Sequence, residues 1–471
     1  MWIANVCQFA LDRIESVTDR GMFSVETNMR IVHLTPGTGS FHCGSCLRDN
    51  ALIKALRDRG HDAVMCPLYL PLVTDDEPAN PELEVQVGGI NLYLRQCFPR
   101  IVGLLPAPVR RFLNAPKRLR SASRRIGMTS ARDLGEMTRG SLQGPDGNQA
   151  PDWQGLVNWL AESEDGVPDV VSLSNSLLAG LVPMIRARLG NNFPIVISLQ
   201  GEDGFLDALD EPYRSECWEL LSAHASETTA IVAPSRYYAA EMEQRFGLNS
   251  GTIHVVPNGF DWERYNQAGK GVERAEDPPE ILYLARLIHD KGLNQMVEGF
   301  LQLRKNATSE SVTSRTRLHL AGAYCDTDRP NIDELKSKID QAGLTKDVRW
   351  SPNVSFEEKV RALKSATLFS IPAPSEYGEA FGLPIIEAMA CGTPVIQPDH
   401  GAYPEIINAT GGGLIHQVDH PADLAEKINR LLEDKATRSQ LATSGRKAVA
   451  ERYSAAAMAE SFEAVLDSTQ S

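Results

Sequence analysis

The sequence contains no run of about 18 consecutive apolar residues, the length that a membrane-spanning helix needs, so no segment is expected to cross a bilayer. It also has no surplus of positive charge, because 47 Lys and Arg stand against 61 Asp and Glu, which gives a net charge of −14. Proteins that bind nucleic acids hold phosphate backbones chiefly with surplus Lys and Arg. The composition therefore disfavours a nucleic-acid partner and favours small-molecule substrates.

The N-terminal residues lack the features of a secretion signal. Residues 2–11 are partly apolar, but no basic segment precedes them, and Asp12, Arg13 and Glu15 follow at once. The first strand-like pattern begins only after Met29, so we expect residues 1–28 to be a poorly ordered extension. We expect the protein to act in the cytoplasm.

Cysteines occur without a clear metal-binding pattern. The chain has eight of them, scattered in a way that suggests reduced thiols. Cys43 and Cys46 form one C-x-x-C motif, and no second such motif occurs. A redox pair, or a metal site completed by Cys66 and Cys97, is one interpretation. A glycine-containing turn that caps a helix is the favoured one, and no metal site is predicted.

Length and pattern indicate two domains. A chain of 471 residues is too long for a single core. Short β-branched runs alternate with helical patterns, which predicts βαβ units and parallel sheets. Residues 266–279, rich in Gly, Glu and Pro, form the predicted linker. We therefore predict an α/β protein with two doubly wound parallel sheets, an N-terminal domain over 29–265, a C-terminal domain over 266–449 and a final helical segment over 450–471.

The predicted strands fall into two series. Those of the first domain are 31–35, 63–67, 170–174, 195–199, 230–234 and 253–257. Those of the second domain are 280–285, 317–321, 348–351, 367–371, 394–398 and 413–416. Helical patterns at 45–59 and 455–466 predict one helix after the first strand and another at the end of the chain.

The most informative segment is residues 379–396, which read EAFGLPIIEAMACGTPVI. It places Glu379 and Glu387 eight residues apart, around a glycine-containing turn and a short apolar helix. The free N–H groups at the start of such a helix are suited to binding phosphate. A carboxylate on an apolar helix needs a hydrogen-bonding partner, and a ribose diol would offer two hydroxyl donors. Both glutamates could instead be solvated or salt-bridged residues near a helix start.

This segment resembles the signature of the retaining glycosyltransferases of family 4, the glycosyl transferases group 1, which have the GT-B fold. The resemblance implies two Rossmann-like domains facing each other across a cleft, with the last helix crossing back to the first domain. It implies transfer of a sugar, of the hexosyl type, from a nucleotide diphosphate sugar to a hydroxyl acceptor, which would be a glycan, a lipid or a small molecule. Glu379 would then contact the transferred sugar and Glu387 the ribose, and the nucleotide sugar would also be bound by Phe381, Gly382 and Leu383.

A second motif opens the C-terminal domain. Arg286 stands at the C-terminal end of a predicted strand, and Lys291 follows five residues later, just before a glycine. The pair resembles the Arg-x4-Lys-Gly diphosphate clamp of the family. Cations and helix dipoles can neutralise a departing diphosphate, so we expect no divalent metal to be required. The nucleotide sugar would be a co-substrate, and no further cofactor is expected. A surface ion pair with Asp290 is the alternative interpretation.

The first domain shows a weaker match. Gly37 and Gly39 follow the first predicted strand, where family members carry a glycine-rich loop that faces the donor, and two glycines let backbone amides approach a phosphate or sugar. At the end of the fourth strand, family members commonly have a histidine that contacts the sugar, whereas this chain has Gln200. Glu202 or Asp203 could instead bind acceptor hydroxyls.

Two loops of the second domain can be compared with those of the family, and one departs from the family pattern while the other matches it. Pro352 stands where a glycine is usual, in the loop that receives the nucleotide base, so the base is not predicted. Residues 400–405 resemble a Gly-x-x-Pro-Glu turn of the family, for which we expect a structural role.

One region differs in composition from the rest. Residues 99–139 contain ten Lys or Arg and only two acids, Asp133 and Glu136. They form either a solvated helical insertion or a surface for an anionic acceptor or bilayer. The second interpretation predicts peripheral association with the inner face of a membrane through residues 100–139.

Two alternative functions stay open at this stage. A GT-B nucleotide-sugar epimerase or hydrolase would share the fold and the donor site but would need no acceptor. A metal-binding or redox protein would depend on Cys43 and Cys46, and the rest of the sequence favours it less.

Overall fold

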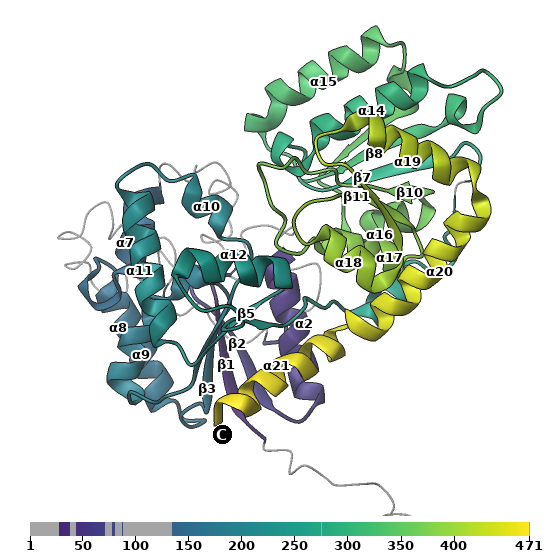
Figure 1. Cartoon of the computed structure of the whole chain (residues 1–471). Coiled ribbons are helices and arrows are strands. Elements are labelled where there is room, and N and C mark those ends of the chain that lie inside the picture. Colours follow the sequence, from purple (N-terminus) through teal and green to yellow (C-terminus); the bar gives the residue numbers. More distant parts are fainter. Residues whose placement is uncertain are drawn as a thin grey trace, which may run out of the picture.

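The computed structural model describes residues 28–37, 44–70, 78–80, 87, 134–274 and 276–470. In these residues the chain forms two lobes, each with a parallel sheet and helices around it (Figure 1). Several predictions fall outside the described residues: the extension 1–27, most of the basic segment, Gly39, Cys43 and Cys97.

The sheet of the first domain has six parallel strands in the order β2-β1-β3-β4-β5-β6. Each strand lies within a run predicted from the sequence or extends it by one residue. The strands are β1 (Arg30–Thr35), β2 (Asp62–Pro67), β3 (Val170–Leu173), β4 (Ile195–Ser198), β5 (Ala230–Ala233) and β6 (His254–Val255).

Two apolar layers cover the two faces of this sheet. Because successive side chains of a strand point to opposite faces, Ile31 belongs to one core and its neighbour Val32 to the other. The helices of this domain are α2 (Gly44–Asp58), α7 (Gly135–Leu142), α8 (Ala150–Glu162), α9 (Leu181–Leu189), α10 (Asp203–Asp207), α11 (Tyr213–Glu227) and α12 (Arg236–Phe246), with short 3₁₀ turns η2 (Gly144–Asp146) and η3 (Ser176–Leu178).

The second sheet also has six parallel strands, in the order β12-β11-β10-β7-β8-β9. The two sheets confirm the predicted doubly wound α/β class. The strands are β7 (Glu280–Leu284), β8 (Arg317–Gly322), β9 (Val348–Pro352), β10 (Leu368–Phe369), β11 (Val395–Pro398) and β12 (Gly413–His416).

The helices of the second half begin before its sheet and continue past it. They are α13 (Trp262–Ala268), α14 (Leu293–Lys305), α15 (Arg329–Gln341), α16 (Phe356–Ser365), α17 (Leu383–Ala390), α18 (Tyr403–Thr410), α19 (Pro421–Glu433), α20 (Lys435–Arg452) and α21 (Ala455–Gln470), with 3₁₀ turns η4 (His289–Lys291), η5 (Val312–Arg315), η6 (Asp326–Asp328) and η7 (Thr345–Asp347).

Strand order fixes where a ligand can enter each sheet. In the second sheet the order reverses between β7 and β10, and in the first between β1 and β3. Open parallel sheets bind ligands beyond the carboxyl ends of their strands at such reversal points. The segments 286–291 and 370–382 follow β7 and β10, so the second reversal point lies beside the predicted motifs.

The chain passes between the lobes twice, at adjacent places. Phe260 N–H donates to Tyr453 C=O at 3.2 Å, and Ala455 N–H donates to Phe260 C=O at 3.0 Å. Beyond this crossing, α21 packs on α2, and Phe462 and Leu466 are buried in a core of the first domain. Figure 1 shows α20 along the second lobe and α21 against the first.

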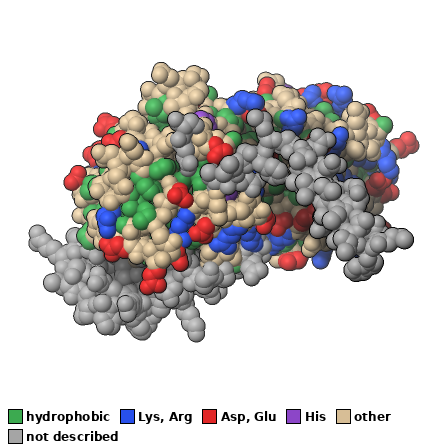
Figure 2. Space-filling model, turned by 90° about the horizontal axis from the view of Figure 1, so that it is seen from below, with side chains coloured by type: hydrophobic (Ala, Val, Ile, Leu, Met, Phe, Trp, Pro, Cys, Tyr) green, Lys and Arg blue, Asp and Glu red, His purple; other side chains and the backbone are tan. Residues whose placement is uncertain are grey.

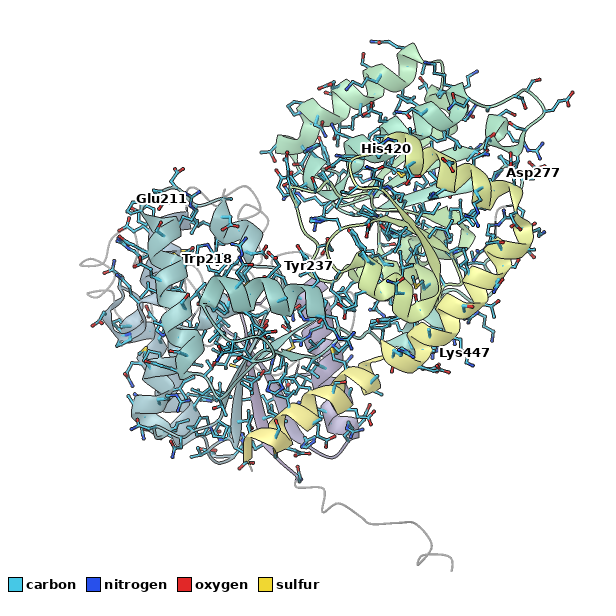
Figure 3. The ribbon with its side chains drawn as sticks, viewed as in Figure 1. Glu211, Trp218, Tyr237, Asp277, His420 and Lys447 are labelled. Atoms are coloured by element: carbon cyan, nitrogen blue, oxygen red, sulfur yellow. The ribbon has the colours of Figure 1, made fainter. Side chains whose placement is uncertain are left out.

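The lobes also touch through α12. Glu405, in the turn at 400–405, accepts hydrogen bonds from the N–H groups of Arg236 at 2.9 Å and Tyr237 at 3.3 Å, so it caps that helix from the other domain. Ser235 Oγ donates to Ala380 C=O at 2.7 Å. Tyr237 lies on the side of α12 that faces the second lobe (Figure 3). The turn at 400–405 therefore connects the lobes.

No helix within the described ranges is long and apolar enough to cross a membrane. Acidic and basic side chains are interspersed over the described part of the face in Figure 2.

Candidate functional site

A cleft of about 650 Å³ lies between the lobes, beyond the carboxyl ends of β7 and β10. This interdomain cleft has the size of a small-molecule site. Eight of the predicted site residues line it, namely Gln200, Arg286, Lys291, Glu379, Phe381, Gly382, Leu383 and Glu387. Gly37 is not among the described residues that line it, and Gly39 lies outside the described residues.

Lys291 and Glu379 form an ion pair inside the cleft. Lys291 ends η4 and Glu379 lies in the loop before α17, yet Nζ and Oε2 are 2.7 Å apart. The Glu379 carboxylate raises the pKa of Lys291 although burial opposes it, so the amine stays protonated. A protonated amine at this position can exchange its carboxylate partner for a phosphate oxygen.

Arg286 lies on the other side of the loop that follows β7. Its Nη2 is 3.3 Å from Asp328 Oδ1 and 3.3 Å from Cys325 Sγ. Burial alone would lower the pKa of Arg286, but Asp328 and Cys325 outweigh it and the pKa is raised. The side chain is 49% exposed, so part of the guanidinium is available to a ligand. The alternative pairing of Arg286 or Lys291 with Asp290 is absent from the ion pairs of the described residues.

Glu387 is held on α17 by two residues that sequence reasoning missed. Lys359 Nζ, from α16, is 2.9 Å from Glu387 Oε1, and the Tyr265 hydroxyl, from α13, donates to the same oxygen. Burial and the nearby Glu387 carboxylate raise the pKa of Tyr265 well above its usual value, so the phenol keeps its proton. Both contacts go to Oε1, which leaves Oε2 able to accept from a ligand.

The start of α17 also faces the cleft. Gly382 precedes the helix with φ of 88°, a left-handed conformation that strains other residues. A Cβ on Gly382 would lie 2.9 Å from Ile385 Cδ1 and 3.0 Å from Tyr403 Cε1. No side chain caps this helix start. Pro384 has no N–H group, and the Ile385 N–H donates to Gly382 C=O at 3.0 Å. The Leu383 N–H and the positive end of the helix dipole are therefore what this helix start offers to an anion.

On the first-domain side, Gln200 follows β4 and lines the cleft. Its Nε2 is buried and has no hydrogen-bond partner within the part of the chain that the structure describes. Such a donor costs free energy unless a ligand or water accepts from it. A sugar hydroxyl would satisfy it.

Glu202 has a structural position instead of an acceptor-binding one. Its two oxygens accept from Ser176 N–H and Gln200 N–H, each at 2.8 Å. Burial raises the pKa of Glu202 although these bonds oppose it. Asp203 accepts from the Tyr238 hydroxyl at 2.8 Å. Neither Glu202 nor Asp203 lines the described cleft.

Gly37 has a steric requirement of its own. Its φ is 86°, and a Cβ would lie 1.9 Å from Leu70 C=O. The close approach of two backbone segments therefore requires glycine here. This reason does not depend on a ligand.

The cleft is more positive than the protein as a whole. Among its described lining residues, five cations face three carboxylates, in a chain of net charge −14. The cations are Arg48, Arg264, Arg286, Lys291 and Lys359, and the carboxylates are Asp261, Glu379 and Glu387. The site is therefore suited to an anionic ligand.

Comparison with known proteins gives the family. The model for Glycosyl transferases group 1 matches residues 267–448, and that for Glycosyltransferase Family 4 matches residues 140–264. The chain belongs to the group 1 glycosyltransferases. The family predicted from residues 379–396 is thereby confirmed.

Curated relatives of this group 1 glycosyltransferase are distant. A D-inositol 3-phosphate glycosyltransferase of Nocardia farcinica is 27% identical over 252 residues, 51% of this chain and 54% of that protein. An alpha-maltose-1-phosphate synthase of Mycobacterium tuberculosis is 28% identical over 258 residues, 50% of this chain and 63% of that protein. The chain therefore matches between about half and two thirds of the length of these relatives.

Solved structures show that the fold is GT-B. Sucrose-phosphate synthase of Thermosynechococcus elongatus superposes with a TM-score of 0.66 at 17% identity, covering 93% of this chain and 98% of that one. HepE of Anabaena, in complex with UDP and glucose, superposes with a TM-score of 0.61 at 16% identity, covering 94% of this chain and all of that one.

The glycosyltransferase cleft contains further residues that the motifs did not reveal. Arg48, on α2, is almost fully buried, and its Nη1 is 2.9 Å from Asp49 Oδ1. Asp49 also lies 3.3 Å from His33 Nε2, and the charges of His33 and Arg48 outweigh burial to lower the pKa of Asp49. From the sequence alone, Arg48 and Asp49 would be expected on an exposed face of the helix. Their burial becomes evident only in the folded domain, where both side chains are enclosed.

The loop after β9 also enters the glycosyltransferase cleft. Pro352 ends β9 and is exposed, whereas the lining residues are Asn353, Val354 and Ser355. Asn353 has φ of 54°, and its Oδ1 accepts from Tyr324 N–H at 3.1 Å. The bend that a glycine would allow thus occurs one residue after Pro352.

The described cysteines are separate thiols. Cys46, on α2, and Cys66, on β2, are both buried, and burial raises the pKa of Cys66 well above its usual range. No group of three or more potential metal ligands occurs among the described residues.

Proposed function

We propose that the protein transfers a sugar from a nucleotide diphosphate sugar to a hydroxyl acceptor in the interdomain cleft. The proposal is supported most by the meeting of Arg286, Lys291, Glu379 and Glu387 at the carboxyl ends of β7 and β10, in a chain of this family. These residues come from segments about a hundred positions apart in the sequence, and together they offer cations, carboxylates and a free helix start.

The cleft offers one contact for each part of a donor. Arg286 and Lys291 would hold the diphosphate, together with the Leu383 N–H and the helix dipole at the start of α17. Glu387 Oε2 would accept from the ribose hydroxyls, because Lys359 and Tyr265 occupy Oε1. Glu379, on the loop before α17, would contact the transferred sugar. In this arrangement the leaving group is neutralised by protein charges, without a metal ion.

Retention of configuration is what membership of this family suggests, and the cleft carboxylates bear on which of two retaining routes is used, double displacement or direct transfer on one face. A double displacement requires a carboxylate that can attack the anomeric carbon. In the described lining, Glu379 pairs with Lys291, Glu387 pairs with Lys359, and Asp261 accepts from Arg264 N–H at 3.0 Å. Each of the three carboxylates has a cation or N–H group beside it, which weakens it as a nucleophile, and Glu387 is assigned to the ribose.

Direct transfer on one face of the sugar fits this arrangement better. The bond between the anomeric carbon and the diphosphate oxygen breaks, and the acceptor oxygen bonds to the same face of that carbon. The acceptor proton passes to the departing diphosphate. Arg286 and Lys291 stabilise the charge that develops on the leaving oxygen.

The test is a turnover assay with uridine, guanosine and adenosine diphosphate sugars against a panel of sugars, polyols and their phosphates. We expect release of the nucleoside diphosphate to depend on the acceptor, and the product to keep the anomeric configuration of the donor in its NMR spectrum. Equal release without any acceptor would identify a hydrolase, and conversion of the donor into another nucleotide sugar without release would identify an epimerase. An inverted product would refute the retaining mechanism.

We further propose, from the sequence of residues 100–139, that the basic segment contacts an anionic acceptor or bilayer. Attraction of this kind weakens with salt, because the Debye length falls from about 10 Å at 0.1 M to about 3 Å at 1 M. Binding to anionic vesicles in a sedimentation assay should therefore disappear at high salt. Replacing Arg110, Arg111, Lys117, Arg118 and Arg120 with Gln should abolish it, and wild-type protein that ignores anionic vesicles at low salt would refute the membrane form.

A further inference from the structure

A second cavity of about 650 Å³ lies at the far end of α17 from the interdomain cleft. Its wall includes Cys391 and Gly392, which follow α17, together with residues from α13, α16, α20 and the segment 272–274. We call it the hinge cavity, because α20 leads from it to the crossing at Phe260 and Tyr453. None of its lining residues lines the interdomain cleft.

Four cations line the hinge cavity, and no carboxylate does, as far as the described residues show. They are Arg274, Lys364, Arg446 and Lys447. None of the four forms an ion pair with a carboxylate in the described ranges, although acids outnumber bases in this protein. Like charges gathered in one cavity repel one another unless an anion joins them.

The partners of three of these cations are neutral oxygens. Arg274 Nη2 donates to Thr393 Oγ1 at 3.2 Å and approaches Cys391 C=O at 3.4 Å. Arg446 Nη2 donates to Asn266 Oδ1 at 2.8 Å, and Lys364 Nζ donates to Gly269 C=O. Burial and the nearby Arg438 lower the pKa of Arg274, so its charge is not fully compensated where it lies.

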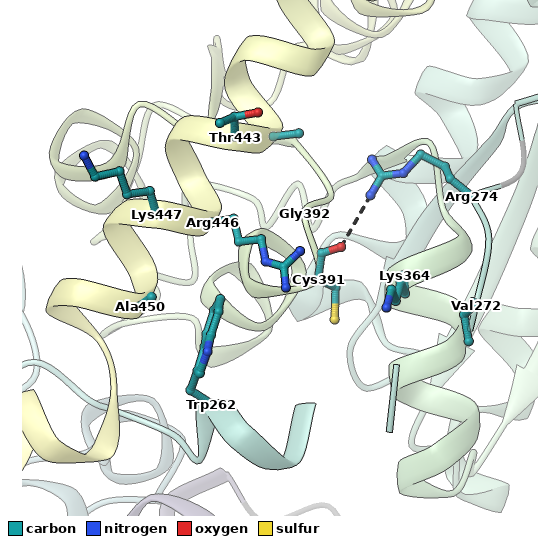
Figure 4. Close-up of a pocket in the computed structure, with 11 residues that line it drawn as sticks. Trp262, Val272, Arg274, Lys364, Cys391, Gly392, Thr443, Arg446, Lys447 and Ala450 are labelled. Atoms are coloured by element: carbon teal, nitrogen blue, oxygen red, sulfur yellow. Dashed lines mark hydrogen bonds between the residues drawn. The ribbon is translucent and has the colours of Figure 1, made fainter. Parts of the chain in front are cut away.

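The cations enter the cavity from opposite sides. Figure 4 shows Arg446 extending from α20 toward Cys391, with Arg274 and Lys364 on the far side of Cys391, whereas Lys447 lies at the outer edge. Arg446 and Lys447 are exposed, and Arg274 and Lys364 are partly buried. A small anion could therefore enter from the α20 side and reach all of the inner cations.

Apart from Thr443, most of the rest of the wall is apolar. Trp262, Val272, Ala442 and Ala450 line the same cavity. The guanidinium of Arg446 lies 5.6 Å from the Trp262 ring centre, a distance at which a cation interacts with an aromatic face. Cations beside an aromatic ring and small apolar side chains suit an anion that carries a compact organic body.

We propose that the hinge cavity binds a small phosphate monoester, separately from the nucleotide-sugar site. Its phosphate would join Arg446 to Arg274 and Lys364, and its carbon body would lie against Trp262. A dianion receiving charge-assisted hydrogen bonds from guanidinium and ammonium groups is held far more firmly than a neutral ligand. The bound ester would tie α20 to the segment 272–274 and to α16.

The position of the hinge cavity links it to the cleft. Trp262 of α13 lines the cavity, while Tyr265 of the same helix holds Glu387 in the cleft. Cys391 at the end of α17 lines the cavity, while Leu383 at its start lines the cleft. An effect of the ester on donor use rests on the proposed function, whereas binding of the ester does not.

Titration calorimetry with glucose 6-phosphate tests the proposal, with inorganic phosphate and glucose as ligand controls. We expect saturable binding of the ester, weaker binding of phosphate and none of glucose. Arg446→Gln with Lys447→Gln should weaken ester binding about tenfold or more, because both lost groups are charged donors. Arg452→Gln removes a charge from the same helix outside the cavity and should change nothing.

A second pair of variants separates the two sites. Arg286→Ala with Lys291→Ala disables the proposed diphosphate clamp and should leave ester binding within about twofold of wild type. The proposal is refuted if the ester does not bind at concentrations up to about 10 mM, if the Arg446 and Lys447 variant binds it as wild type does, or if the clamp variant abolishes binding. Because Arg446 and Lys447 are exposed, thermal melting should show that their variant folds normally.

Discussion

The two sides of the interdomain cleft differ in how the chain supplies them. On the second-domain side, three of the charged residues come from two short segments, Arg286 with Lys291 and then Glu379, and each segment directly follows a central strand. On the side of the first sheet, the lining residues are scattered over Gly44 to Ala51, Gln200 and Pro234. The second-domain side neutralises charge through local motifs, whereas the first-domain side offers shape, the neutral donor Gln200 and one cation, Arg48, that is already paired with Asp49.

The difference between the two sides matches what the two substrates would require, if the second domain binds the donor and the first domain the acceptor. A diphosphate is the same in every nucleotide sugar, so a short motif at a strand end suffices for it. Acceptors vary, and a surface assembled from separate loops can change one loop at a time. Variants on the two sides should therefore fail in different ways.

The largest effect is expected at the clamp. Arg286→Ala and Lys291→Ala should each reduce donor turnover by about 10²–10³, because each removes a cation from the leaving diphosphate. Thermal melting should hardly change, since both side chains are partly exposed and line an open cleft. Steady-state kinetics and melting curves on each variant measure both quantities. Full activity in the double variant would show that the clamp is misassigned.

Variants of Glu379 and Glu387 should change different kinetic parameters. Glu379→Gln should mainly lower kcat, because Glu379 is expected near the reacting carbon, and it also releases Lys291 from its ion pair. Glu387→Gln should mainly raise the donor KM, by about tenfold, because it contacts ribose in ground and transition states alike. Tyr265→Phe is a matched control that removes one contact of Glu387 without changing charge. The same kinetic change in both glutamate variants would contradict the division of roles.

Gln200 provides the contrasting test on the first-domain side. Gln200→Ala removes a buried donor without altering charge, so we expect a loss of about threefold to tenfold in kcat/KM. Nucleoside diphosphate affinity should be unchanged, because the clamp lies in the other domain. Calorimetry with the nucleoside diphosphate measures its affinity, and kinetics of the full reaction measure kcat/KM. A large loss of nucleotide affinity would mean that the two sides are not separate.

The smallest effect concerns the helix that joins the domains. Glu463, on α21, is 2.9 Å from His61 Nε2 and also pairs with Arg59 of the first domain. Burial alone would raise the pKa of Glu463, but these partners outweigh it and the pKa is lowered. A lowered carboxyl pKa contributes stability that is present above the ordinary value and lost as pH falls through the folded value.

Glu463→Gln should therefore lower the melting temperature by about 1–2 °C at neutral pH. The gap from wild type should close as the pH falls below the ordinary glutamate range of about 4.3. Melting curves from pH 7 down to about pH 3 measure it, because the loss falls below the ordinary glutamate pKa. A gap that is constant with pH would show that the carboxylate charge does not contribute.

Most of the fold followed from sequence patterns. Every strand of both sheets lies in or at a predicted run, because buried parallel strands read as continuous apolar and β-branched segments. The two shortest strands, β6 and β10, were predicted longer than they are. The length of a strand depends on how far the neighbouring strands form hydrogen bonds with it. The strand's own sequence does not contain that information.

The candidate site was less evenly predictable. Lys291, Glu379 and Glu387 could be found because they stand in compact motifs that contain glycines. Lys359 and Tyr265 could not, because each stands in a helix whose sequence resembles a solvated face, and their roles arise only from packing against α17. The acceptor role considered for Glu202 failed for a similar reason, since backbone amides already occupy both of its oxygens.

The most direct test of the account is the melting temperature of the wild-type protein with uridine, guanosine and adenosine diphosphates, beside the same measurement on the Arg286→Ala, Lys291→Ala double variant. A ligand that binds only the folded state raises the melting temperature in proportion to RT ln(1 + [L]/Kd). We predict that at least one nucleoside diphosphate stabilises wild type and that the double variant loses this stabilisation while melting normally without ligand. No shift with any of the three, or an equal shift in the double variant, would contradict a nucleotide-sugar site in the interdomain cleft.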